Sequence, residues 1–207
     1  MWGDVAIAAM MIVANGLGAG LLLPQVHHLR RTRSIAGLSG AGIGVGIGLN
    51  LWWVAYGIVS TAPGIIPASA IGVLLYVTVA WALWQAGTDG DRRRLANTTL
   101  LAVFAPLIAV ITGGIAALGV ALGVAYTVQF APAAIEATTA PDVSGISPTT
   151  WLMACGEAAI WAVYGLTLAD VALVIGGIGG AAMAGIVLAN TWRPVRTSRP
   201  TPPSGVR

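Results

Sequence analysis

The sequence predicts an all-α integral membrane protein whose seven transmembrane helices form two parallel triple-helix bundles joined by a linker helix. Three observations predict this fold class. Hydrophobic residues make up 57% of the 207 residues and charged residues only 8%, whereas roughly a quarter of the residues are charged in a soluble domain. Apolar runs of about 20 residues, long enough to cross a bilayer core, recur along the chain. One sequence pattern also occurs twice within these runs.

The repeated pattern covers residues 21–57 and 129–165 without a gap. Each matched residue lies 108 positions from its counterpart, and the pairs are Pro24 and Pro132, Gly37 and Gly145, Ser39 and Ser147, Trp53 and Trp161, Tyr56 and Tyr164, and Gly57 and Gly165. A duplicated membrane module usually places a shared site between its two halves. We therefore expect a site at the interface of the repeats.

Turn signals at 60–64, 87–90, 140–142 and 168–170 separate the apolar segments. We expect helices at 5–29, 40–59, 64–85, 95–115, 118–137, 148–166 and 170–191. Because one helix stands between the two three-helix units, both units run in the same direction. The predicted divisions are a first repeat (1–86), a cytoplasmic loop with linker helix four (87–117), a second repeat (118–192) and a disordered cytoplasmic tail (193–207).

The basic residues predict the orientation. All ten are arginines, and they follow the first, third and seventh helices, within 30–33, 92–94 and 193–207. Cytoplasmic loops are enriched in basic residues, so we expect an outside N-terminus and a cytoplasmic C-terminus in the cell (plasma) membrane. The N-terminal residues lack the basic region of a cleavable secretory signal.

Three motifs occur in order in the first repeat. Pro24-Gln25 lies near the end of helix one, and Gly37-Leu38-Ser39 and the segment LWWVAYG at 51–57 follow a basic loop. This combination resembles the PQ-loop signature of the SWEET and SemiSWEET sugar transporters, in the PQ-loop (MtN3) superfamily. The resemblance covers nearly the whole chain apart from helix four and the tail, and the arrangement of three, one and three helices is similar to full-length SWEETs. It implies sugar transport by alternating access between two bundles.

The resemblance also implies ligand contacts. In the family, a tryptophan of the second helix and an asparagine of the third helix of each unit flank the sugar. Trp53 and Trp161 match the tryptophans, and the asparagine positions, thirteen residues beyond the tyrosine of each repeat, fall on Ser69 and Gly177. The second Pro-Gln is replaced by Pro132-Ala133. The superfamily also includes amino-acid transporters.

The residues themselves favour a solute site near the two tryptophans. An indole face stacks on the apolar face of a sugar ring, and its N–H donates one hydrogen bond. Packing, or anchoring at the membrane interface, is the alternative role for both tryptophans. We expect the helix faces that hold Asn50 and Trp53, and Glu157 and Trp161, to oppose each other around a polar pocket.

Glu157 is the most unusual single residue, because an ionisable group within a membrane helix favours a functional role. It is expected to bind a hydroxyl or amine of the solute, or to carry a coupling proton. The alternative is a protonated carboxyl group that bonds a neighbouring helix.

Two further pairs are candidates for moving parts. Pro24 and Pro132 interrupt helical hydrogen bonding and are candidate hinges, with Gln25 available to satisfy the freed carbonyls; a static kink is the alternative. Tyr56 and Tyr164 end their helices near the outer interface and are candidate gates, or belt tyrosines of the kind common at that level.

No nucleophile–base set, metal-ligand spacing or nucleic-acid module is visible, so we expect no enzyme, no cofactor and no metal site. The adjacent His27 and His28 point in different directions on a helix. The expected partners are a small solute, with sugar favoured, and the lipid bilayer, with the protein a monomer or homo-oligomer. Two alternatives stay open: a proton-coupled carrier of amino acids or other metabolites, and a non-transporting membrane receptor or assembly factor.

Overall fold

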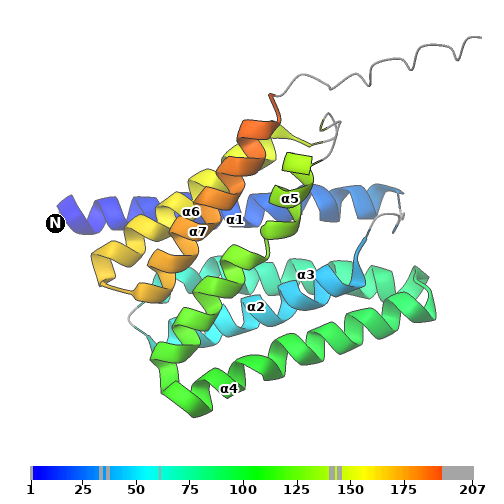
Figure 1. Ribbon diagram of the computed structural model, residues 1–207, viewed down its shortest axis with the longest axis horizontal. Helices are drawn as coiled ribbons and strands as arrows, with labels where there is room; N and C mark the ends of the chain where they lie inside the picture. The colour runs from blue at the N-terminus through cyan, green and yellow to red at the C-terminus, as the bar shows by residue number, and fades with distance from the viewer. Residues whose placement is uncertain are drawn as a thin grey trace, which may run out of the picture.

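The structure, a computed structural model, describes residues 2–32, 35, 38–60, 62–139, 143 and 146–192, and their regular structure is entirely helical. Figure 1 shows the helices in chain order: α1 (Trp2–Thr32), α2 (Gly40–Val59), the 3-10 turn η1 (Pro63–Ile65), α3 (Ile66–Ala86), α4 (Asp89–Val128), α5 (Ala131–Thr139), α6 (Pro148–Leu168) and α7 (Val171–Asn190). The repeat pair Gly37 and Gly145, Arg33, and the predicted tail 193–207 lie outside the described residues.

Six helical segments are long and apolar enough to cross a membrane, and one of them, Asp89–Thr139, has 51 residues. A straight helix of that length would measure about 75 Å, more than twice the about 30 Å of a bilayer core. The chain instead turns at Gly113 and Gly114, whose dihedral angles are not helical. Gly114 has a φ of 66°, which favours glycine. The segment therefore makes two crossings, and the predicted seven-helix membrane fold is confirmed.

Most predicted boundaries hold within a few residues, but two details were wrong. The predicted turn at 87–90 ends at Thr88, because Thr88 and Asp91 form a capping box that starts α4 at Asp89. Arg92, Arg93 and Arg94 consequently lie on the helix rather than in a loop. The predicted helix 118–137 is interrupted at Gln129 and Phe130, between α4 and α5.

The repeated serines have a structural reason. Ser39 is the N-cap of α2, where its hydroxyl accepts a hydrogen bond from the Gly42 N–H (3.2 Å). Ser147 is the N-cap of α6 and accepts from the Thr150 N–H (3.4 Å). Each serine satisfies one of the backbone donors that a helix start leaves unpaired. The second helix of both repeats therefore begins in the same way.

The helices pack in the same order in both halves. In the first half α3 contacts both α1 and α2, whereas within the described chain no Cα atoms of α1 and α2 lie within 8 Å of each other. In the second half α7 contacts α4, α5 and α6, and Figure 1 shows α6 and α7 side by side. The third helix thus lies between the first and the second in each bundle. Between the halves, α1 contacts α6, and Gly119 in the second part of α4 lies against the Tyr56 ring of α2.

The first part of α4 packs closely on α2 through glycines four residues apart. A Cβ atom added at Gly40, Gly44 or Gly48 would collide with atoms of α4, including those of Ala102 and Thr98. The Trp52 indole N–H also donates to the Val103 carbonyl (2.9 Å). The linker helix is therefore bound tightly to the first bundle, as small residues at a membrane-helix interface allow.

The buried apolar residues form clusters that differ between the two ends of the molecule. One cluster takes residues from both halves, among them Met11, Trp53, Leu118, Trp161 and Leu173. A second cluster lies within α1–α3 and the start of α4, and a third joins α5 to α7. The two halves are therefore packed together at one end and have separate cores at the other.

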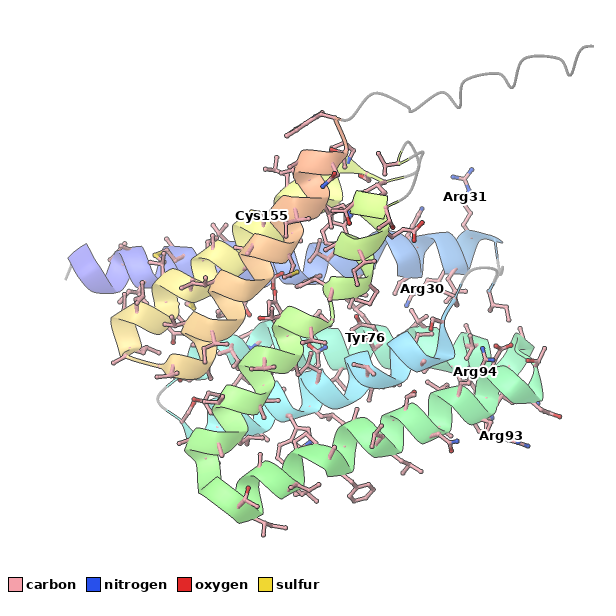
Figure 2. All side chains as sticks on the ribbon, viewed as in Figure 1. Arg30, Arg31, Tyr76, Arg93, Arg94 and Cys155 are labelled. Carbon is pink, nitrogen blue, oxygen red and sulfur yellow. The ribbon has the colours of Figure 1, made fainter. Side chains whose placement is uncertain are left out.

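The separate cores lie at the end that holds the arginines, which we call the basic end. Figure 2 shows Arg30 and Arg31 of α1 and Arg93 and Arg94 of α4 at this same end of the molecule. The described arginines thus share one side, as the sequence predicts for the loops after helices one and three.

Candidate functional site

A cavity of ≈ 310 Å³ lies between the two halves. Helices α1, α2, α3, α4, α6 and α7 all contribute to its wall. The six residues that the sequence singled out for solute binding all line it: Asn50, Trp53, Ser69, Glu157, Trp161 and Gly177. Residues of the Asn50–Trp53 and Glu157–Trp161 faces thus line one cavity, and their role in solute binding stays a prediction. The volume lies in the range typical of small-molecule sites.

The cavity reaches the surface toward the basic end. Its lining includes Thr150, an exposed residue in the first turn of α6, together with Phe130 and Trp151. At its other end lie Trp53 and Trp161, which are 8% and 7% exposed and belong to the cluster shared by both halves. The cavity is therefore accessible from the basic end and sealed at the opposite end, which we call the sealed end.

Hydrogen bonds between the halves reinforce the sealed end. The Tyr56 hydroxyl of α2 donates to the Asp170 carboxylate, with distances of 3.0 and 3.1 Å to its two oxygens. Asp170 is also the N-cap of α7, where it accepts from the Leu173 N–H (3.1 Å). In the other direction, the Tyr164 hydroxyl of α6 accepts from the Gly64 N–H (3.3 Å). Both candidate gate tyrosines are thus buried contacts between bundles.

Asn15 connects α1 to the start of α3 near the same end. Its side-chain amide donates to the carbonyls of Met11 (2.6 Å) and Gly64 (3.1 Å), and its oxygen accepts from the Ala68 N–H. The bonds to Gly64 and Ala68 join α1 to the start of α3 and are of the kind that polar residues make between membrane helices.

Glu157 lies at the centre of the polar contacts in the cavity. The residue is buried, at 7% exposed. Oε1 accepts a hydrogen bond from the Trp161 indole N–H (3.1 Å), and Oε2 lies 3.4 Å from the Tyr126 hydroxyl of α4. Across the bundle interface it faces α1, because a Cβ atom added at Gly18 would stand 2.7 Å from Oε1.

Trp53, the counterpart of Trp161, has different surroundings. Its indole nitrogen is buried and has no hydrogen-bond partner in the protein. The residue one turn earlier, equivalent to Glu157, is the apolar Leu49. Asn50 donates from its amide to the Gly46 carbonyl (2.8 Å) and packs against Gly72 of α3. A buried, unpaired N–H at the wall of a cavity is a ready donor for a bound solute.

The two positions that hold asparagine in the family, Ser69 and Gly177, contribute differently to the cavity. Ser69 is buried on α3 and presents its hydroxyl side chain at the cavity wall. Gly177 contributes backbone only, and a Cβ atom there would collide with the backbone of Ala162 and Ala158. Glycine at 177 is therefore explained by the close contact of α6 and α7 rather than by solute binding.

The candidate hinge residues are placed only in part. Pro24 and Gln25 belong to α1, which continues through both positions, but their side chains lie outside the described residues. Pro132 is the second residue of α5, directly after the interruption at Gln129 and Phe130. Since proline has no N–H, it cannot close the helical hydrogen bond there.

The sequence analysis did not single out five contributors. Asp170 entered it only as the start of the last helix, and Gly18 did not enter it. Tyr76 of α3 and the ring pair Phe130–Trp151, with centroids 5.9 Å apart, line the cavity as well. A weak signal existed for Asp170: it is an acidic residue in a short loop on the side opposite the arginines, where the sequence has few charges. Within the described part of the chain, no three His, Cys, Asp or Glu side chains come together as a metal site.

The fold and cavity define a class, namely a seven-helix membrane protein with two triple-helix bundles around a central cavity. Among solved structures, the chain is similar to a eukaryotic SWEET transporter determined at 3.7 Å resolution. The sequences are 16% identical, the match covers 92% of this chain and 97% of the other, and the TM-score is 0.77. The resemblance read from the motifs is thereby confirmed at the level of the fold. No protein-family model matches the chain, and no curated protein matches it significantly.

Proposed function

We propose that this protein transports a small polar solute, a mono- or disaccharide, across the membrane by alternating access between its two bundles. One observation carries the proposal: a cavity between the halves is accessible at the basic end and sealed at the other by residues of both halves. A cavity sealed on one side is what one state of an alternating-access transporter requires.

The chemistry of the wall supports a sugar as the solute. Trp53 and Trp161 supply indole surfaces, which stack on the C–H faces of sugar rings. Asn50, Ser69 and Glu157 supply polar groups for hydroxyls. A site with this mixture discriminates by hydrogen bonds and still buries an apolar ring face.

The contacts at the two ends of the cavity determine the steps of the proposed transport cycle. Opening the sealed end would break the contacts of Tyr56 with Asp170 and of Tyr164 with Gly64, so both tyrosines would act as gates. The separate cores of the basic end would then close on each other. Pro24, Gln25 and Pro132 are the proposed hinges.

The proposed moving units are the repeats at 1–86 and 118–192, with 87–117 as the connection. If the arginines face the cytoplasm of the cell, with the N-terminus outside, the cavity is open to the cytoplasm in this conformation. Because one chain supplies both halves of the cavity, a second copy is not needed to complete it, and monomer and homo-oligomer are both compatible with the function.

Counterflow in proteoliposomes tests the proposal. The panel includes glucose, sucrose and several neutral amino acids, and compares wild type with the double substitution Trp53→Ala/Trp161→Ala. Sugar counterflow that disappears in the double variant would support the proposal. Trp81→Ala is the matched control, because Trp81 is 65% exposed on α3 and does not line the cavity; it should leave counterflow unchanged.

Glu157 favours a second candidate, a carrier of amino acids or other metabolites, since its carboxyl group suits an amine. Flux of amino acids alone would select that candidate. A folded, monodisperse protein that moves no solute on the panel would favour a receptor or assembly factor. In that case Trp53→Ala and Glu157→Ala should alter stability or partner capture.

A further inference from the structure

The hydrogen bonds of Glu157 can satisfy its carboxyl group in two protonation states. The Trp161 indole N–H can only donate, so Oε1 is an acceptor whether or not the group carries a proton. The Tyr126 hydroxyl can donate or accept. When Glu157 is ionised, Tyr126 donates to Oε2; when Oε2 holds a proton, that O–H can donate to the tyrosine oxygen. The proton position is therefore Oε2, and its partner can reverse roles.

Within the described residues, the protein offers Glu157 no positive charge. No arginine or histidine lines the cavity, and the described arginines lie in the terminal turns of α1 and the first turns of α4. Tyr126 faces the carboxyl group from α4, and Tyr76 of α3 lines the same cavity. The lining residues of α1 and α7 include no titratable group; they are Gly18, Leu21, Leu22, Leu173, Gly176 and Gly177. An unpaired carboxylate in a membrane interior costs about 3 kcal/mol or more, and no described residue at the cavity supplies a cation that would compensate the charge of the ionised form.

The carboxyl group also lies where the two halves meet. Glu157 belongs to α6 in the second half, and its Oε1 is positioned directly against Gly18 of α1 in the first half. Rocking of the halves would change the contact between α1 and α6 and, with it, the access of water to Oε2. A proton site at a moving interface can be exposed to each side of the membrane in turn.

We propose that Glu157 binds a proton at Oε2 on one side of the membrane and releases it on the other, so that the protein cotransports a proton with its solute. This rests on the transport function proposed above. In the step, the carboxylate and a proton from water form the O–H bond of the carboxylic acid, and the same bond breaks when the proton returns to water on the opposite side. Tyr126 keeps its own proton throughout and changes only from donor to acceptor.

The test uses the full-length protein in proteoliposomes that contain a trapped pH-sensitive dye, with the membrane potential clamped to zero by potassium and valinomycin. Solute counterflow at equal pH on both sides reports the proposed function. Proton movement driven by a solute gradient reports cotransport. For one proton per solute, a gradient of one pH unit should concentrate the solute about tenfold at equilibrium, since one pH unit corresponds to about 1.4 kcal/mol.

The results separate the two proposals. Counterflow accompanied by solute-driven proton movement supports cotransport. Counterflow of a neutral solute without proton movement overturns cotransport and leaves the transport function in place. Flux of an amine-bearing cation without proton movement also overturns it, and assigns the compensating charge to the solute. Absence of all counterflow overturns the transport function and cotransport together.

Substitutions at the two glutamates test whether Glu157 holds the transported proton. Whatever counterflow Glu157→Gln retains should no longer respond to a pH gradient. Glu136→Gln is the matched control, because Glu136 is the other glutamate of the chain and is exposed on α5; it should behave as wild type in both measurements. A pH gradient that still concentrates solute in Glu157→Gln would overturn the assignment to this residue.

Infrared difference spectra of the purified protein between acidic and alkaline buffer give a readout without any solute. A carboxylic-acid carbonyl band that disappears in Glu157→Gln and shifts in Tyr126→Phe is expected, because Tyr126 bonds the oxygen that holds the proton. If wild type and Glu157→Gln give the same difference spectrum, Glu157 does not exchange a proton and the inference fails.

Discussion

The two halves of the cavity share their framework and differ in their polar groups. Trp161 has an acidic residue one helical turn earlier, and its N–H donates to Glu157, whereas Trp53 has Leu49 there and its N–H is unpaired. The sealed end repeats this difference. Tyr56 donates to the carboxylate of Asp170, while the residue of the first half equivalent to Asp170 is Ala62, which provides no side-chain cap.

The comparison shows what the repeat preserves. Residues that fix shape are matched, namely the capping serines, the Trp-x-x-Tyr-Gly segment and the helix order. The charged groups of the cavity and of the sealed end, Glu157 and Asp170, both belong to the second half. Two matched surfaces can therefore enclose one solute while presenting different chemistry to its two sides.

The largest difference between the halves is expected at the asparagine positions. Gly177→Asn should destabilise the protein by more than about 3 kcal/mol or prevent folding, because the new side chain would overlap the α6 backbone. Ser69→Asn should be tolerated within about 1 kcal/mol, since the larger side chain can extend into the cavity. The stability of both variants is measured by the yield of monodisperse protein and by reversible unfolding in mixed micelles. Equal effects at the two positions would contradict the packing difference.

The tryptophans provide the next comparison. Trp161→Phe keeps an aromatic ring but leaves Oε1 of Glu157 without its donor, so a loss of about 1–3 kcal/mol in the free energy of unfolding is expected. Trp53→Phe removes an N–H that bonds nothing in the protein, and should leave stability unchanged or slightly raised. Solute affinity should instead weaken in Trp53→Phe if that N–H binds the solute. A larger loss of stability at Trp53 would show that its nitrogen has a partner.

A smaller difference in the free energy of unfolding is expected between substitutions of the two tyrosines at the sealed end. Tyr56→Phe removes a bond to a carboxylate, and Tyr164→Phe removes a bond from a backbone N–H. Interhelical hydrogen bonds in membranes contribute about 0.6 kcal/mol on average and up to about 1.7 kcal/mol, so Tyr56→Phe is expected near the upper value and Tyr164→Phe near the mean. Unfolding in mixed micelles measures stability. The reverse order would mean that the Asp170 contact is weak.

The smallest difference is expected at the caps. Ser39→Ala and Ser147→Ala should each cost about 1 kcal/mol, since both serines make the same contact at the start of a second helix. Ser39→Gly and Ser147→Gly are controls that should lose only a few tenths of a kcal/mol. Clearly unequal losses at the two alanines would show that the two helix starts are not equivalent.

The fold could be predicted to a large extent, because the constraints of the membrane are visible in the residues. The apolar runs long enough to cross a membrane, the constant spacing of the repeat and the positions of the arginines can all be seen directly in the sequence. The start of α4 was misplaced because a capping box competes with the turn signal of Gly87 and Gly90. The interruption at Gln129 and Phe130 was missed because both residues are compatible with a helix.

The site could be predicted in its residues but not in its contacts. Glu157 and Trp161 are four residues apart on one helix, so their proximity follows from helical geometry. Tyr126, Gly18 and Asp170 come from other helices, and only the tertiary packing shows which of them faces Glu157 or Tyr56. Likewise, Gly177 matches a ligand position along the chain, while its contact with Ala162 can be known only from the structure.

The bend at Gly113 and Gly114 has a consequence for how the protein could be assembled. The part of α4 before the bend is locked onto α2 by glycine contacts and by Trp52, and the part after it packs on α7. Each side of the bend therefore already has its own packing partners. A chain cut at this point and expressed as two polypeptides should reassemble in the membrane, so the protein could be made in two pieces whose halves are labelled or exchanged separately.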